Sequence, residues 1–150
     1  MYQKILVPID SSAASFRALD EACTLGRALD VTLYVVHVVD LAQVGLAGVS
    51  VAENLALRQS VSTSSSAILA QAEEMVAQRG VAFEGKVLEN KGEKIADLLV
   101  NEAGENHCQL IIMGTHGFSG VKRLLLGSVA EGVVRQSTIP VMLVRRPENT

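Results

Sequence analysis

The segment KILVPID, residues 4–10, decides the fold of this chain. It is short and apolar at successive positions, which is typical of a parallel strand covered by helices on both faces. The segment VTLYVVHVV at residues 31–39 has the same character, whereas VAFEGKVLE at residues 81–89 alternates more and is expected nearer an edge of the sheet. Two later apolar segments complete five predicted strands: QLIIMG at residues 109–114 and IPVMLVRR at residues 139–146.

Helical patterns separate these strands. Ser11 and Ser12 are available to cap the first helix. Apolar side chains recur every three or four residues in four segments: residues 16–29, residues 67–79, about residues 93–103, and the segment after Gly127. A regular alternation of strands and helices predicts right-handed crossovers and a doubly wound parallel sheet with helices on both faces, in the α/β class.

The predicted secondary structure is least clear over residues 40–66. Ser50 and Glu53 have the spacing of a capping box, which favours a helix that begins at Val51. The serine-rich run at residues 60–66 has poor helix propensity and favours a solvated turn instead. The two interpretations stay open at this point.

Composition narrows the class of protein. The chain has 150 residues, 49% of them apolar, which is enough for one domain over residues 1–150. A net charge of -3 without a block of Lys and Arg argues against a nucleic-acid partner. No apolar run reaches the roughly 18 to 20 residues of a membrane span, so we expect a soluble, cytoplasmic protein. Cys23 and Cys108 lack metal-ligand spacing and are expected to be reduced core thiols.

The segment GTHGFSGVKRLLLGSVAEG, residues 114–132, carries five glycines between two predicted strands. It matches neither a Walker loop, nor G-x-G-x-x-G, nor the G-x-S-x-G of hydrolases. What remains is G-x2-G-x9-G-S, with Gly114 and Gly117 at the end of a strand and Gly127 and Ser128 at the start of a helix. A helix N-terminus offers free N–H groups to an anion, which favours a phosphate site. The simpler alternatives are that Gly114 only ends a strand and that Ser128 only caps a helix.

The spacing resembles the glycine signature of the universal stress protein family, in its ATP-binding branch, G-x2-G-x9-G-[ST]. KILVPIDSS resembles the first strand of that family, IIMGTHG its fourth, and LLLGSVAEGVV with IPVMLVR its closing helix and strand. The resemblance covers nearly the whole chain and is weakest over residues 40–66. It implies a five-stranded parallel sheet of order 3-2-1-4-5.

The resemblance also implies which residues bind the nucleotide. Asp10 would face the ribose or a phosphate-bound Mg²⁺, although an Asp at this place also commonly caps a helix. The adenine slot would be lined by Pro8, Ile9, Val38 and Met113. The ribose and phosphates would be held by Gly114, His116, Gly117, Gly127, Ser128 and Val129.

The function implied is that of an ATP-binding regulatory protein of the stress response, whose occupancy by ATP, or by AMP or ADP, biases conformation or the choice of a protein partner. The alternatives are a slow ATP-hydrolysing or adenylyl-transferring enzyme and a nucleotide-free dimeric scaffold. No catalytic residue is evident, so an enzyme is not the favoured interpretation. The apolar last strand, with Ile139, Val141 and Leu143, predicts a homodimer through that strand.

Overall fold

The computed structural model describes residues 1–40, 51–116 and 126–145. Its strands and helices alternate along the chain in the predicted order. The elements are β1 (Lys4–Ile9), α1 (Ala13–Leu29), β2 (Thr32–Asp40), α3 (Val51–Gln78), β3 (Ala82–Asn90), α4 (Ile95–Glu105), β4 (Leu110–Gly114), α5 (Ser128–Gln136) and β5 (Val141–Val144).

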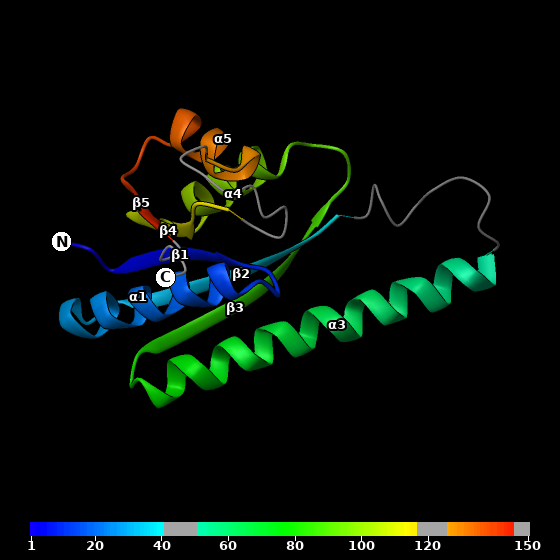
Figure 1. The fold of residues 1–150 in the computed structure, drawn as a ribbon, viewed down its shortest axis with the longest axis horizontal. Helices are drawn as coiled ribbons and strands as arrows, with labels where there is room; N and C mark the ends of the chain where they lie inside the picture. The colour runs from blue at the N-terminus through cyan, green and yellow to red at the C-terminus, as the bar shows by residue number, and fades with distance from the viewer. Residues whose placement is uncertain (41–50, 117–125, 146–150) are drawn as a thin grey trace, which may run out of the picture.

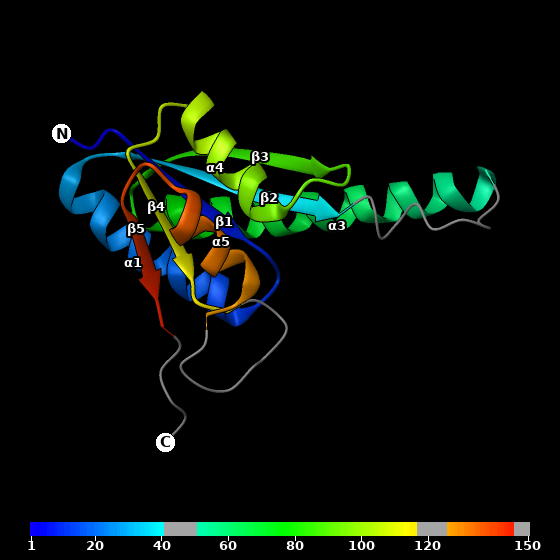
Figure 2. The ribbon, with the colours of Figure 1, turned by 90° about the horizontal axis from the view of Figure 1, so that it is seen from above.

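The five strands form one parallel sheet in the order β3-β2-β1-β4-β5. The predicted fold class and strand order are therefore confirmed, and β3 lies at an edge as its alternating pattern indicated. Helices α1 and α3 cover one face of the sheet, and α4 and α5 cover the other (Figures 1 and 2). The carboxyl ends of the strands meet at one edge, where ligands of such sheets usually bind.

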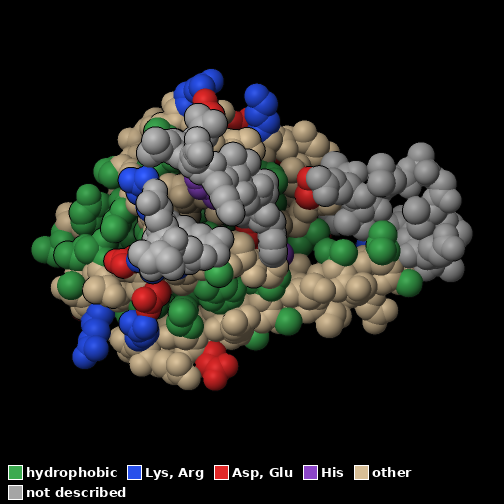
Figure 3. Space-filling view, in the orientation of Figure 1, with side chains coloured by type: hydrophobic (Ala, Val, Ile, Leu, Met, Phe, Trp, Pro, Cys, Tyr) green, Lys and Arg blue, Asp and Glu red, His purple; other side chains and the backbone are tan. Residues whose placement is uncertain are grey.

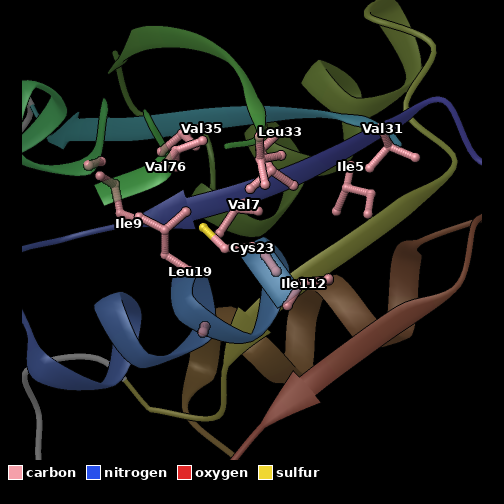
Figure 4. Packing of buried hydrophobic residues seen from close by; sticks show 14 of the residues in the cluster. Ile5, Val7, Ile9, Leu19, Cys23, Val31, Leu33, Val35, Val76 and Ile112 are labelled. Carbon is pink, nitrogen blue, oxygen red and sulfur yellow. The ribbon is translucent and has the colours of Figure 1, made fainter. Parts of the chain in front are cut away.

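Each face of the sheet has its own apolar core. On the α1/α3 face, buried side chains from β1 and β2 pack against α1 and the C-terminal half of α3. Figure 4 shows Leu19 and Cys23 of α1 pointing toward Val7 of β1. On the other face, Leu6 and Ile111 pack against α4 and α5. Cys23 and Cys108 are both buried and free, as expected of core thiols.

Helix α1 begins directly after Ser12, one of the two serines that were expected to cap it. Ser12 is the N-cap residue, and its Oγ accepts a hydrogen bond of 3.2 Å from the Ser15 amide. The start of α1 is thereby fixed directly after the end of β1.

The serine-rich run is helical, so the expectation of a solvated turn at residues 60–66 is wrong. Helix α3 begins at Val51, as the capping-box spacing favoured, and continues to Gln78. Ser65 is only 2% exposed and begins a buried stripe that continues with Ala72 and Val76. Packing against the sheet thus outweighs the weak propensity of serine. The N-terminal half of α3 extends past the sheet (Figure 1).

Charged side chains are dispersed over the face of the molecule that Figure 3 shows. On the face shown in Figure 3, Lys and Arg lie apart from one another and beside Asp and Glu, with no basic patch among the residues drawn in colour. Within the described ranges, no helix is long and apolar enough to cross a membrane. That residues 1–150 make a single domain stays a prediction.

Candidate functional site

The start of α5 is joined to the end of β4. The Gly127 amide donates a hydrogen bond of 2.8 Å to the carbonyl oxygen of Thr115, the residue that follows β4. Gly127 is the N-cap residue of α5 and makes no side-chain cap. The alternative that Ser128 only caps the helix is therefore wrong, because Ser128 is already the first helical residue.

The first amides of α5 have no acceptor among the described residues. Glu131 is the first residue whose amide donates within the helix, to the Gly127 carbonyl at 2.9 Å. The amides of Ser128 and Val129 have no protein acceptor in the described part of the chain. Ser128 is exposed and Val129 half-buried, so these donors and the positive end of the helix dipole can receive an anion.

Gly127 has a packing reason to lack a side chain. A Cβ on this residue would lie 3.2 Å from the Thr115 carbonyl oxygen and 3.5 Å from the His116 Cα. Gly114 ends β4, and its Cβ would lie 3.3 Å from the Ala14 carbonyl oxygen in the first turn of α1. Both glycines allow backbone segments to approach closely where α1, β4 and α5 meet.

His116 lies beside this junction. Its Nδ1 is 3.1 Å from the Thr115 Oγ1. Its Nε2 is buried and has no hydrogen-bond partner among the described residues. Most buried ring nitrogens in folded proteins have a partner, so this one is a candidate ligand-binding atom.

Asp10 is held in a short hydrogen-bonded turn between β1 and α1. Its Oδ1 accepts a hydrogen bond of 2.7 Å from the Ser12 amide, and its own amide donates to the Ser15 Oγ at 3.1 Å. Asp10 therefore supports the start of α1 without being its cap, which is Ser12. Its Oδ2 has no protein donor in the described ranges and remains available.

The apolar residues expected around adenine come from both faces of the sheet. Val38 and Met113 belong to the α4/α5 core, and Pro8 alternates with the buried Leu6 on that side. The Ile9 side chain belongs to the α1/α3 core, so it reaches the same edge through its backbone only. Gly117 lies outside the described residues.

Sequence reasoning missed His37. This residue pairs with Ile9 in the register of β1 and β2, and its Nδ1 is 2.9 Å from the Ile9 carbonyl oxygen. A lone histidine near the end of an apolar strand was the available signal. Thr115 was also missed, because nothing in a single threonine indicates that its backbone receives the start of a distant helix.

No group of three or more His, Cys, Asp and Glu side chains in the described ranges is placed to hold a metal ion. A Mg²⁺ bound near Asp10 would therefore take most of its oxygen ligands from phosphate and water, as Mg²⁺ commonly does.

A hollow elsewhere on the surface does not belong to this edge. It has a volume of about 420 Å³ and lies at the C-terminal ends of α1 and α3, lined by Cys23, Thr24, Arg27, Ala28 and Arg79. Arg79 is already paired there with Asp20. The hollow is therefore at the opposite edge from the strand ends and from the start of α5.

One bacterial protein and one archaeal protein illustrate the sequence similarity. The universal stress protein YxiE of Bacillus subtilis is 38% identical over 151 residues, covering 97% of this chain and 100% of that protein. The universal stress protein MJ0531 of Methanocaldococcus jannaschii is 32% identical over 149 residues, covering 99% of this chain and 85% of that protein.

Solved structures are similar as well. The structure of MJ0577 of Methanocaldococcus jannaschii superposes with a TM-score of 0.86 over 99% of both chains, at 24% identity. A universal stress protein in complex with cAMP superposes with a TM-score of 0.69 at 26% identity, covering 96% of this chain and 97% of that one. Two others, from Archaeoglobus fulgidus with dAMP and from Arabidopsis thaliana with AMP, share the fold at 24% and 18% identity, with TM-scores of 0.64 and 0.70.

These similarities agree with the strand order and with the layers of the fold. The model of the Universal stress protein family matches residues 1–145, nearly the whole of the chain. The chain belongs to the universal stress protein family.

Proposed function

We propose that this protein is a regulatory protein of the ATP-binding branch of its family and binds an adenine nucleotide, ATP foremost, at the carboxyl edge of the sheet. The observation that carries the proposal is the N-terminus of α5, which has no side-chain cap. Its free amides begin at Ser128, next to Gly127, which has no side chain. Phosphate groups match these donors. The complexes of similar proteins with cAMP, dAMP and AMP support adenine as the base.

In this proposal the phosphates bind at Gly127, Ser128 and Val129. Asp10 binds the ribose or a Mg²⁺ held by the phosphates, through the carboxylate oxygen that the turn before α1 leaves available. The adenine is lined by Pro8, Val38 and Met113, with the Ile9 backbone. Gly114, His116 and Gly117 surround the ribose and the first phosphate.

A regulatory role fits the polar groups on this edge better than rapid catalysis. Fast phosphoryl transfer needs a positioned nucleophile and a clamp of cationic groups on the transferred phosphate. Asp10, Thr115 and His116 are among the described polar side chains at this edge, and none of them is a cation clamp. Nucleotide occupancy would then act by biasing conformation or partner choice in the cytoplasm.

A homodimer through β5 is part of the proposal. The two edges of the sheet differ in chemistry: β3 carries Glu84, Lys86 and Glu89, whereas all four residues of β5 are apolar. Charges on an edge strand oppose pairing with another chain, and an apolar edge favours it. Met142 of β5 is 38% exposed, and Ile139, Val141 and Leu143 are half-buried beside it.

The test is to identify nucleotide that accompanies the protein. Protein freshly purified from cells is heat-denatured, and the released small molecules are separated by chromatography. We expect ATP, ADP or AMP at a substantial fraction of one per chain in the wild type and far less in Gly127→Val. Gly104→Ala is the control, because a Cβ at Gly104 meets nothing within 4 Å. An absence of nucleotide, even after incubation with millimolar ATP, would contradict the proposal.

A further inference from the structure

The peptide unit that joins Ile9 to Asp10 is held from both sides. Its carbonyl oxygen, which belongs to Ile9, lies 2.9 Å from the Nδ1 of His37 on the neighbouring strand β2. Its N–H, which belongs to Asp10, donates a hydrogen bond of 3.1 Å to the Ser15 Oγ in the first turn of α1. The orientation of this peptide plane is therefore set by two side chains that come from different elements.

Chemistry fixes the direction of the contact with His37. A carbonyl oxygen only accepts hydrogen bonds, so the Nδ1 of His37 must be the donor. The hydrogen of the neutral ring is then on Nδ1, and the backbone of β1 sets the tautomer of this histidine. The His37 side chain is half-buried, so part of the water that would compete for the Ile9 carbonyl is excluded.

The His37 ring lies on the face of the sheet away from the expected adenine slot. Leu33 and Val35 of β2 belong to the α1/α3 core, and His37 continues their alternation on that face. Val38, expected to line the adenine slot, packs against the α4/α5 core instead. His37 can therefore influence a nucleotide through the backbone of β1.

The residue that this backbone positions is Asp10. Its Oδ1 accepts a hydrogen bond of 2.7 Å from the Ser12 amide, and its carbonyl oxygen accepts one of 2.8 Å from the Ser15 Oγ. These bonds are made inside the segment from Asp10 to Ser15, whereas the contact with His37 fixes the point at which the segment leaves the sheet. A rotation of the peptide plane before Asp10 would redirect its available oxygen, Oδ2.

We propose that His37 is a positioning residue for nucleotide binding: its Nδ1–H holds the Ile9 carbonyl and thereby directs the Asp10 carboxylate toward the nucleotide. The inference rests on the proposed function, in which Asp10 binds the ribose or a Mg²⁺ held by the phosphates. It adds to the site a residue of β2 that acts without touching the nucleotide.

The first experiment is calorimetric titration of ATP with Mg²⁺ into the wild type and three variants. His37→Leu removes the donor and should weaken binding about threefold to tenfold, the usual net worth of one hydrogen bond. His37→Asn places an amide nitrogen near the position of Nδ1 and should restore the affinity to within about twofold of the wild type. His37→Gln places it near Nε2 and should not. A bond that only stabilised the fold would lower the melting temperature of His37→Leu and leave the ATP affinity unchanged.

A double-mutant cycle tests whether His37 acts through Asp10. Asp10→Asn retains an oxygen that can accept from the Ser12 amide and replaces the second carboxylate oxygen with an amide nitrogen. In this background His37→Leu should weaken ATP binding by less than about twofold, because the group that His37 positions is already lost.

The second experiment observes the ring of His37 directly in nucleotide-free wild type. In two-bond ¹H–¹⁵N spectra at about pH 8, above the ordinary range of imidazole titration, His37 should show a protonated Nδ1. Its signals are assigned as those lost in His37→Asn. The backbone amide resonances of Asp10 and Ser12 should move more in His37→Leu than in His37→Asn.

The outcomes separate this inference from the proposed function. If the wild type does not bind ATP, the proposed function fails and the role given to His37 fails with it. If the wild type binds ATP and folded His37→Leu binds it equally well, the proposed function stands and the positioning role is wrong. An equal loss in the wild-type and Asp10→Asn backgrounds, or a protonated Nε2 on His37 in the free protein, would also overturn the role of His37 alone.

Discussion

A Cβ atom on Gly132 of α5 would lie 2.6 Å from the Cβ of Ala96 on α4, closer than two packed carbon atoms come. The two helices touch at this point because neither residue has a longer side chain. The contact sets the distance of α5 from α4 and thereby the place of the α5 N-terminus. One of the glycines in the segment 114–132 is thus explained by helix packing.

Gly132→Ala is expected to destabilise the protein by about 1–3 kcal/mol through overpacking, reduced by the higher helix propensity of alanine. Thermal unfolding measures the effect. Gly104→Ala in α4 is the matched control, because a Cβ there meets nothing within 4 Å and should leave stability unchanged or slightly raised. Equal melting temperatures for the two variants would show that α4 and α5 do not pack as described.

A buried carboxylate links β2, β3 and α4. Glu102 Oε1 accepts hydrogen bonds from the Tyr34 hydroxyl at 2.6 Å, from Lys86 Nζ at 3.0 Å and from Asn106 Nδ2 at 3.0 Å. Burial alone would raise the pKa of Glu102, but the hydrogen bonds from Tyr34 and Lys86 outweigh it and hold the pKa below its ordinary value. Burial and the bond to Glu102 raise the pKa of Tyr34.

Glu102 should therefore contribute stability that is present above about pH 4.3, the ordinary pKa of a glutamate, and is lost as the pH falls through the lower folded value. Glu102→Gln is expected to cost about 1–3 kcal/mol at pH 7 and progressively less below pH 4. Denaturant unfolding at a series of pH values measures this. Glu105→Gln, exposed on the same helix, should show no such trend. A constant difference between wild type and Glu102→Gln from pH 7 to pH 3 would contradict the assignment.

The two thiols are expected to be unreactive in the folded protein. Burial raises the pKa of Cys108 to about 11 and also raises the pKa of Cys23. Thiolate is the reactive form, so little of it is present at pH 8. A disulfide reagent should label neither cysteine quickly in native protein and both in denaturant. Rapid labelling of Cys108 without denaturant would mean that the α4/α5 core opens.

The β5 edge should hold two chains together. Met142→Asp places a charge on the exposed apolar edge and should shift a dimer toward monomer by at least about tenfold in dissociation constant, because an unpaired carboxylate is costly to bury. Sedimentation equilibrium measures the shift. Val87→Asp on the β3 edge, where Val87 is 36% exposed, is the control and should leave association unchanged. A wild type that is monomeric at high concentration would rule out the dimer.

The sequence was sufficient for the fold wherever apolar periodicity was strong. The run from Ile5 to Ile9 is apolar because both faces of β1 are covered, so its pattern could be interpreted without other information. The serine run of α3 could not be predicted, because its helical state depends on the packing of the stripe from Ser65 to Val76 against the sheet. Such packing is a tertiary interaction, and the helix propensities of the individual residues carry no information about it.

The candidate site was predictable to a similar extent. Spacing alone placed Gly127 before a helix and Gly114 at the end of a strand, and both lie where expected. The hydrogen bond between Thr115 and Gly127 joins residues twelve positions apart in the sequence and leaves no local pattern. The His116 nitrogen without a partner is likewise a property of the packed structure and not of the sequence.

The most direct test of the account is calorimetric titration of ATP, with Mg²⁺, into nucleotide-free protein. We predict one saturable site per chain in the wild type and in Gly104→Ala, and a loss of at least about tenfold in affinity for Gly127→Val, whose added side chain would crowd the Thr115 carbonyl at the start of α5. Gly127→Val should remain folded by circular dichroism. An absence of saturable ATP binding by the wild type at millimolar nucleotide, or equal binding by folded Gly127→Val, would contradict the account.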